Sequence, residues 1–515
     1  MTTAFLALSS WSRAFCLYVL LTVLLLRLIY LRYRNNLNAF PGPVVASVTD
    51  LWRLWYSYHN KNGIPMVKLH EEYGPVIRIG PRMLSFSTPE AVRDIYGPGK
   101  NFKKSEFYSV IAPLQNGVIK DTLFSTRDQA YHSGYRRAVN SSFSMSVILQ
   151  YESYLDETTQ IFLNKIDEII TQTKGKKGLI DLPRLLQYYA FDAVAMLAYS
   201  KRYGFVEKNT DIDGIMKTTR FILDYTSHMG NYPLWDKIFL KNPLMRLLGR
   251  LGFINMTTPM IPFAINSQAE RLREFKANPN RKEKNRDILD SYMALHIAKP
   301  DIVTENEVLE LGVMLGFAGS ESTGVALSAL IYYVVRDARV YGKLQSELNS
   351  HLATSVTGVT YAETQTLPYF DACVKETFRI HPPSGFIMER VTPPSGAQIA
   401  GYTVPGNTIV GCNPWAVHRD KATFGEDVEV FRPERWLEPS EDEVRKIWKS
   451  MIHFGAGPHT CMGRHVSVLE IYKLGATILR HFKITLTEQD RVYKLTVGQF
   501  VRLDFSVMLE RVEGL

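Results

Sequence analysis

The stretch that decides the fold is Phe454-Gly455-Ala456-Gly457-Pro458-His459-Thr460-Cys461-Met462-Gly463, a loop near the C-terminus with one cysteine among several glycines. Gly457 and Gly463 would allow a positive φ, or a close approach of the main chain to a flat ligand that a Cβ would block. A lone cysteine is more often an inert buried residue, and glycine-rich loops are common. The full spacing Phe-Gly-x-Gly-x-x-x-Cys-x-Gly is much rarer. It predicts a thiolate that a stiff backbone presents to a metal.

Length and composition indicate one large globular domain. The chain has 515 residues, of which 46% are hydrophobic and 12% aromatic, and no Gly/Ser linker or repeat follows residue 40. The four cysteines have no C-x-x-C spacing, which argues against a zinc site and a disulfide scaffold. The net charge of +9 is spread along the chain, which argues against a nucleic-acid partner. A solvated surface, a membrane surface or an acidic redox partner would each account for it.

The N-terminus predicts a retained membrane anchor. Ala14–Leu31 is an apolar run near the minimum length of a transmembrane helix. A cleaved signal peptide is the alternative, but Arg32 and Arg34 follow the run in place of an Ala-x-Ala cleavage site. The excess of positive charge after the run predicts a cytosolic domain. Phe40-Pro41-Gly42-Pro43 then supplies a stiff break. We therefore expect an anchor over residues 1–34, a proline-rich hinge over 35–48 and a catalytic domain over 49–515.

The rest of the pattern is mainly helical with small β-sheets, an α+β class. Long apolar periodicities with few prolines run from about residue 125 to 380. Short strand-like runs are Val76–Ile79, Met83–Phe86, Ala397–Val410 and Lys483–Leu509. No Gly-x-Gly-x-x-Gly follows a strand, so a doubly wound nucleotide-binding fold is not indicated.

One predicted helix has an unusual centre. Thr304 and Glu307 form a capping box, and an apolar helix follows through about Val335. Its middle, Gly316–Gly324, contains glycines and polar residues that weaken or bend a helix. A kink or a packing groove would explain them. The functional interpretation is a notch for a ligand, where Glu321 and a hydroxyl relay protons.

Two further groups of charged residues have ordinary explanations when each is taken alone. Glu376 and Arg379 lie at i and i+3 of a helix predicted over Pro368–Ile380, as in many surface ion pairs. His132 and Arg136 lie at i and i+4 of another helix, as on many solvated basic faces.

Together these motifs, in this order, resemble those of the cytochrome P450 family, over nearly the whole chain. The family pattern Ala/Gly-Gly-x-Asp/Glu-Thr-Thr/Ser is matched at Ala318, Gly319, Glu321 and Thr323, and departs at Ser322. The resemblance implies the cytochrome P450 fold, preceded here by a transmembrane helix. The stretch 413–420 is similar to fungal microsomal members such as the pisatin demethylases.

The resemblance also implies roles for single residues. Cys461 would be the axial thiolate ligand of haem b iron. The catalytic residues would be Glu321, Ser322 and Thr323. Residues that bind the cofactor, several through its two propionates, would be His132, Arg136, Arg390, Phe454, Gly457, His459, Cys461 and Gly463. His459 departs from the family, which usually has arginine two residues before the ligand. Arg435, in Pro433-Glu434-Arg435-Trp436, would complete a buried triad with Glu376 and Arg379.

The function implied is a monooxygenase that inserts one oxygen atom of O2 into an apolar small molecule, in fungal secondary metabolism or detoxification. NADPH would act indirectly, through NADPH–cytochrome P450 reductase, with cytochrome b5 as a further partner. The chain would be a single-pass protein of the endoplasmic reticulum membrane with a cytosolic catalytic domain. Substrate contacts would come from Val110–Leu114, Met314, Phe317 and Ser384–Ile387. Two alternatives stay open: a haem-thiolate isomerase or dehydratase without NADPH, and a non-catalytic haem or lipid binder.

Overall fold

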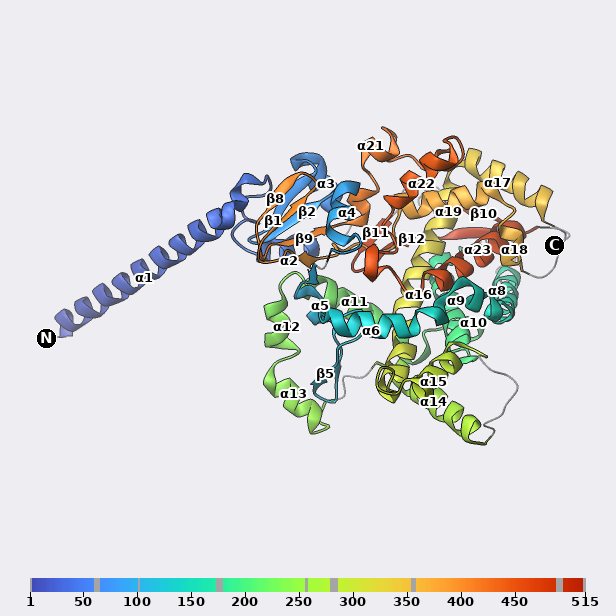
Figure 1. Cartoon of the computed structure of the whole chain (residues 1–515), viewed down its shortest axis with the longest axis horizontal. Helices are drawn as coiled ribbons and strands as arrows, with labels where there is room; N and C mark the ends of the chain where they lie inside the picture. The colour runs from blue at the N-terminus through green and yellow to red at the C-terminus, as the bar shows by residue number, and fades with distance from the viewer. Residues whose placement is uncertain are drawn as a thin grey trace.

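A long N-terminal helix projects from a broad, mostly helical body, and a small sheet lies at the end of the body nearest that helix (Figure 1). The computed structural model describes residues 2–59, 65–100, 102–172, 179–254, 258–277, 286–352, 358–487 and 494–512, with the backbone alone for residues 2–14, 65 and 494. The two chain ends lie at opposite ends of the molecule (Figure 1). The mainly helical α+β class predicted from the sequence is confirmed.

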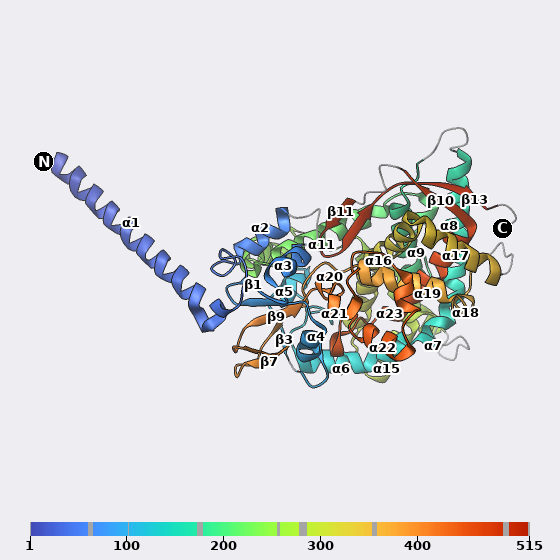
Figure 2. The same cartoon turned by 90° about the horizontal axis from the view of Figure 1, so that it is seen from above.

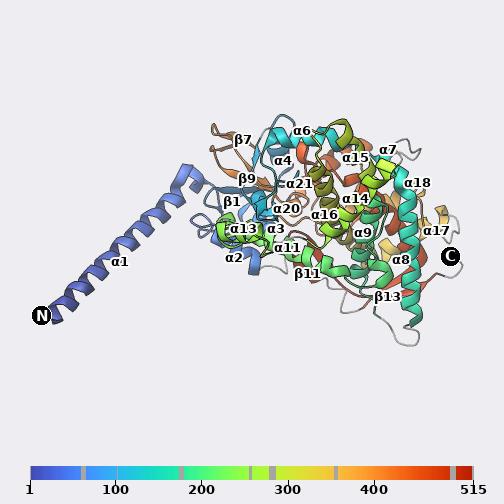
Figure 3. The ribbon, with the colours of Figure 1, turned by 90° about the horizontal axis from the view of Figure 1, so that it is seen from below.

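Helices account for most of the body. The longest are α1 (Thr2–Tyr33), α8 (Glu152–Gln172), α9 (Leu182–Tyr199), α14 (Met260–Ala277), α16 (Glu305–Arg336) and α23 (Arg464–His481). The others are α2 (Leu51–His59), α3 (Pro65–Tyr73), α4 (Pro89–Tyr96), α5 (Phe107–Ile111), α6 (Gln129–Val139), α7 (Met145–Ile148), α10 (Phe205–Lys208), α11 (Ile215–Met229), α12 (Pro233–Phe239), α13 (Pro243–Arg250), α15 (Ile288–Ala298), α17 (Ala338–His351), α18 (Tyr361–Thr364), α19 (Pro368–Ile380), α20 (Pro414–Val417), α21 (Lys421–Phe424) and α22 (Glu441–Lys449). Helix α16 crosses the body and packs against α9 and α23, as Figures 2 and 3 show from opposite sides.

The predicted strands are present. The main sheet has the order β1-β2-β9-β6-β3, with β2 and β9 parallel and the other pairs antiparallel. Its strands are β1 (Val76–Gly80), β2 (Met83–Phe86), β9 (Ile409–Cys412), β6 (Arg390–Val391) and β3 (Lys103–Lys104). The two-stranded sheets are β4 (Leu114–Gln115) with β5 (Val118–Ile119), β7 (Ala397–Ile399) with β8 (Tyr402–Val404), β10 (Phe482–Leu486) with β13 (Val507–Arg511), and β11 (Lys494–Val497) with β12 (Val501–Asp504).

Local sequence signals set the ends of the central helices. The Thr304 side chain and the Glu307 carboxylate form the predicted capping box at the start of α16, and the helix runs to Arg336. Pro368 occupies the first turn of α19, which ends at Ile380 as predicted. Both predictions are confirmed, because caps and prolines act locally and need no tertiary information.

The N-terminal helix is a candidate membrane anchor. Phe15–Ala39 is long and apolar enough to cross a membrane, and none of its apolar window is buried. Helix α16 passes the same test of length and composition, but 72% of its window is buried, so it is a core helix. The predicted span began at Ala14, whose side chain lies outside the described residues, and α1 continues two residues beyond the predicted end, to Tyr33.

A buried arginine joins the end of α1 to the main sheet. Arg78 of β1 is 1% exposed, and its side chain donates to the carbonyls of Arg32 (2.6 Å), Leu31 (2.7 Å), Pro81 (2.9 Å) and Ser47 (3.1 Å). The last carbonyls of a helix have no partner within the helix, and a cation there interacts favourably with the helix dipole. Arg78 therefore fixes the last turn of α1, the hinge and the β1–β2 turn to one another.

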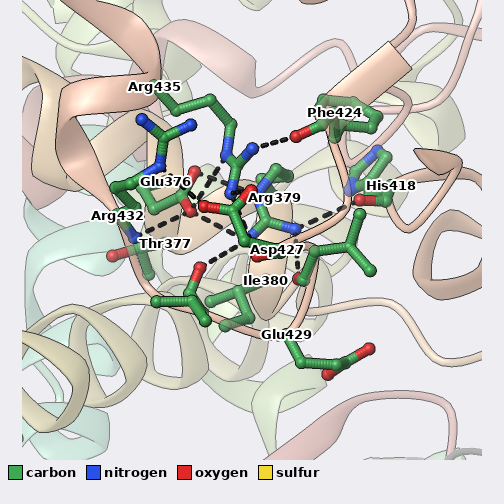
Figure 4. A network of polar contacts seen from close by, with 12 residues as sticks. Glu376, Thr377, Arg379, Ile380, His418, Phe424, Asp427, Glu429, Arg432 and Arg435 are labelled. Atoms are coloured by element: carbon green, nitrogen blue, oxygen red, sulfur yellow. Dashed lines mark hydrogen bonds and ion pairs between the residues drawn. The ribbon is translucent and has the colours of Figure 1, made fainter. Parts of the chain in front are cut away.

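A second buried arginine network joins α19 to the segment around Arg435 (Figure 4). Glu376 and Arg379 of α19 are fully buried and form a two-bonded ion pair, at 2.8 and 2.9 Å. Arg435, in the short helix η5 (Pro433–Trp436), donates to the same carboxylate at 3.4 Å, and the Trp436 indole donates to it at 2.9 Å. The predicted triad is therefore present and buried.

His418 connects this network to the loop that contains the cysteine. Its carbonyl accepts from Arg379, and its Nδ1 lies 3.2 Å from the Phe378 carbonyl, so Nδ1 carries the proton. Nε2 is then free to accept from the backbone N–H of Ile452, at 2.8 Å. Burial, then the neighbouring His453 and Arg379, hold the pKa of His418 well below its usual range. The neutral ring thus links α19 to the backbone just before the cysteine loop by two hydrogen bonds.

Arg78→Met should loosen the hinge. The substitution leaves several buried carbonyls without a donor, each worth about 1 kcal/mol or more. Because cleavage of a locally opened segment follows its opening equilibrium, we expect chymotrypsin to cut after Tyr33 at least about tenfold faster. Arg82→Met, at an exposed position of the same turn, is the control and should leave the rate unchanged. Equal rates in the two variants would show that Arg78 does not hold the hinge.

Arg435→Met should destabilise the whole domain. Removing one partner from a buried carboxylate costs about 3–5 kcal/mol of unfolding free energy, which denaturant unfolding measures. Arg339→Met is the control, because Arg339 pairs with Glu434 while 48% exposed, and such pairs contribute about 0–1 kcal/mol. A loss for Arg435→Met as small as that of the control would contradict the importance of the triad.

Candidate active site

The cysteine loop is held by its own backbone and by α4. The Cys461 N–H donates to the Phe454 carbonyl at 2.6 Å, and the side chain of Cys461 is exposed. Gly457 has a φ of +61°, as expected, and a Cβ there would lie 1.8 Å from the Tyr96 carbonyl. Protein backbone, and not a ligand, is therefore what requires glycine at this position. Gly463 has a φ of −80°, so of the two expectations the positive φ does not apply there; no atom of the described residues lies within 4 Å of the place for its Cβ, which leaves room for the close approach of a flat ligand.

The surroundings of Cys461 act on its thiol in opposite directions. Although the Cys461 side chain has accessible surface, the protein atoms around the sulfur partly desolvate it and so raise the pKa of the thiol, while the Gly463 N–H and the guanidinium groups of Arg136 and Arg464 lower that pKa. Helix α23 begins at Arg464, so its positive end also faces the sulfur and favours the thiolate. A metal ion would complete this balance by deprotonating the thiol outright.

Five basic groups gather beside the cysteine loop. His132 and Arg136 come from α6, Arg390 from β6, His459 from the short helix η6 (Gly457–His459) and Lys104 from β3. The rings of His132 and His459 lie 4.1 Å apart, centre to centre. Burial, then the other cations, lower the pKa of His459 to about 2 and that of His132 to about 4. The structure thus brings together all four of the basic residues predicted for the propionates.

Lys104 is a member that sequence reasoning missed. It lies directly opposite Arg390 in the antiparallel β3–β6 pair, and like charges opposite one another destabilise a sheet. Burial, then Arg390 and Arg136, lower the pKa of Lys104 to about 7, while Asp121 acts to raise it. Lys104 joins the basic cluster only because β3 pairs with β6, and no local sequence pattern predicts that pairing.

The centre of α16 has one open face. Ala318 is exposed although the helix around it is largely buried, and Ser322, one turn later, is half-buried. The Ser322 hydroxyl donates to the Ala318 carbonyl at 2.8 Å. This open face in a buried helix is what the predicted notch requires.

The three predicted catalytic residues point to different neighbours. Glu321 has no exposed surface and pairs with Arg502 of β12, while Gln187 of α9 donates to it. The Thr323 hydroxyl lies 3.1 Å from that of Ser467 in α23. Only Ser322 lies on the face that Ala318 leaves open.

These residues fit the haem that the resemblance implies. An exposed cysteine suits the iron, and the concentrated positive charge suits two carboxylates, which would relieve the repulsion between Lys104 and Arg390. The Nδ1 atom of His459 is buried without a hydrogen-bond partner among the described residues, as a donor that awaits a ligand group would be.

Comparison with known proteins gives a consistent answer. The family model for cytochrome P450 matches residues 48–508. A cytochrome P450 monooxygenase of Emericella nidulans is 32% identical over 474 residues, which are 92% of this chain and 93% of the relative. One from Aspergillus terreus is 33% identical, over 91% and 94% of the two chains. The pisatin demethylase of Fusarium vanettenii is 32% identical, over 94% and 91%. With its cysteine loop and buried glutamate–arginine network, this chain belongs to the cytochrome P450 family and is an oxidoreductase.

Proposed function

We propose that the chain inserts one oxygen atom of O2 into an apolar small molecule, in fungal secondary metabolism or detoxification. The observation that carries this proposal is the exposed Cys461 beside the cluster of basic residues, just before α23, which packs against α16. Relatives that are named as fungal monooxygenases, and one named pisatin demethylase, support the reaction class.

We assign the site residues as follows. Haem b held by the Cys461 thiolate would supply O2 activation and O–O cleavage. The side chains of His132, Arg136, Arg390, His459 and Lys104 would bind the two carboxylates of the cofactor. Phe454, Gly457 and Gly463 would shape the loop against it.

Proton delivery would begin on α16. The Ser322 hydroxyl lies at the open face and would hold a proton there, while Glu321 would replace that proton from the other side of the helix. Thr323, bonded to Ser467, would keep α16 in place against α23.

The N-terminus supports a proposal for the location of the chain and, with it, for its electron donors. We propose electron delivery by NADPH–cytochrome P450 reductase, with cytochrome b5 as a second donor. The anchor over residues 1–34 and the hinge over 35–48 would hold the catalytic domain, 49–515, on the cytosolic face of the endoplasmic reticulum as a single-pass protein. The exposed apolar helix from Phe15, and Arg32 and Arg34 after it, support this orientation.

A cavity of about 100 Å³ supports an apolar substrate. It is lined mainly by apolar and aromatic side chains, among them Trp52, Phe107, Phe386 and Ile387. Of the predicted substrate-contact segments, Ser384–Ile387 contributes to this lining. Val110–Leu114, Met314 and Phe317 are not among the described residues that line it.

Cys461→Ala should abolish the carbon-monoxide absorption band of reduced, thiolate-ligated haem and all NADPH-supported turnover. Cys16→Ala, in the exposed N-terminal helix, is the control and should keep both. Retention of the band in Cys461→Ala would refute the assignment of the ligand. In the wild-type chain with reductase, oxygenated product without NADPH consumption would instead favour an isomerase or dehydratase.

His459→Ala should release haem to apomyoglobin at least about tenfold faster, because a hydrogen bond to a charged group contributes about 1.5–3 kcal/mol. His459→Arg should hold haem at least as tightly as the wild type, since guanidinium adds a permanent charge and more donors. His465→Ala, which removes a ring bonded to Arg464, is the control. If His459→Ala loses haem no faster than the wild type, this side chain does not contact a propionate.

A further inference from the structure

Glu321 is turned out of the site in which the proposed function needs it. Its carboxylate is fully buried, whereas Ala318, one turn earlier on α16, is exposed. Arg502 of β12 pairs with one carboxylate oxygen, and Gln187 of α9 donates to the other. Arg220 of α11 lies 3.7 Å from the carboxylate and also donates to Gln187. The acid is therefore held on the side of α16 that faces β12 and α11.

Arg502 is shared between this buried acid and a surface acid. It is 13% exposed and lies 3.4 Å from Asp224 of α11, which is 44% exposed. Burial acts to lower the pKa of Arg502, but the attraction of Glu321 and Asp224 outweighs it, so the net shift is upward. The guanidinium thus joins α16, β12 and α11 through two carboxylates.

The same two outer elements form walls of the cavity. Val497, Gly498 and Val501, around the β11–β12 turn, line one side, while Ser227, His228 and Asn231, in and after α11, line another. The two walls are joined by the Thr226–Gln499 hydrogen bond, at 2.9 Å, and by the Asp224–Arg502 pair.

Gly498 brings the cavity and the ion pair within contact distance. A Cβ at Gly498 would lie 2.5 Å from Oδ1 of Asp224, so this carboxylate packs directly on the turn that lines the cavity. A ligand that moves the turn relative to α11 must therefore shift Asp224 against Arg502.

We propose that Arg502 is a positioning residue that couples occupancy of this cavity to the direction of Glu321. With the cavity empty, Arg502 keeps Glu321 away from Ser322 and so limits oxygen use without substrate. A ligand between the β11–β12 turn and α11 loosens the Asp224–Arg502 pair and lets Glu321 reach the open face of α16. This coupling rests on the proposed role of Glu321 in proton delivery.

The test uses the haem-loaded full chain with reductase and no added substrate. Turnover then forms peroxide, as NADPH, H⁺ and O2 give NADP⁺ and H2O2. Arg502→Met should raise the rate about fivefold, equivalent to about 1 kcal/mol, and Arg502→Lys less. Gly498→Ala should raise it from the cavity side by displacing Asp224. Arg511→Met, which breaks the comparable ion pair to Asp167, is the matched control and should have no effect.

The double variant Glu321→Gln/Arg502→Met separates positioning from general loosening. If Arg502 acts through Glu321, the double variant has the rate of Glu321→Gln alone. An increase that persists in the double variant, or a wild-type rate in Arg502→Met, overturns the coupling. In a separate assay with an apolar substrate present, Glu321→Gln alone should turn over more slowly or release more peroxide than the wild type; equal rate and peroxide yield there would refute the proposed proton delivery, and the coupling with it.

A second readout needs no turnover. In the oxidised, haem-loaded chain without NADPH, amide hydrogen exchange at residues 316–324 and 220–228 should be faster in Arg502→Met than in Arg502→Lys. In Gly498→Ala it should be faster at 220–228. Unchanged exchange in both segments of Arg502→Met would refute the link between α16 and α11.

Discussion

One buried carboxylate sets the position of much of this protein. The Glu376 side chain has no exposed surface, and Arg379, Arg435, the Trp436 indole and the backbone N–H of Arg432 all donate to it. Apart from Arg379, which lies in α19 itself, each donor belongs to a segment whose place is then fixed relative to α19. Because an unpaired charge in the interior is so costly, the segment that contains Arg435 cannot drift without loss of stability. Through Arg379 and His418 the constraint reaches the backbone just before the cysteine loop.

The basic cluster at the candidate active site, unlike the Glu376 network, is unfavourable without a ligand. Lys104, Arg390 and Arg136 crowd together although their charges repel, and burial, then these neighbouring cations, keeps the pKa values of His132 and His459 low. A fold that tolerates such a cluster needs compensation, and an anionic cofactor supplies it. The Glu376 network therefore stabilises the scaffold in the absence of any ligand, whereas the basic cluster favours the loaded protein over the empty one.

Sequence reasoning succeeded where the signal is local or where a motif has a fixed spacing. The capping box of α16, the Pro368 start of α19 and the triad are of this kind. It failed at Lys104, because two-residue strands leave no periodicity, and their pairing is a tertiary event. At Gly457 it anticipated the positive φ but not the close approach of the Tyr96 carbonyl, and at Gly463 the positive φ that it allowed is absent. Adjacent positions on α16 suggested one group of catalytic residues, but at about 100° per residue Glu321, Ser322 and Thr323 face three different neighbours.

Arg78 donates only to main-chain carbonyls at the end of α1, so this contact does not depend on which side chains the helix carries. The apolar residues before it are free to change during evolution, as long as the helix still ends at the same residue. Insertion or deletion of one residue would be a different matter, since it would rotate the helix by about 100° and move it by 1.5 Å relative to the clamp. The side chains of α1 before Leu31 are therefore not constrained by Arg78, whereas the rotation of the helix about its axis relative to the domain is.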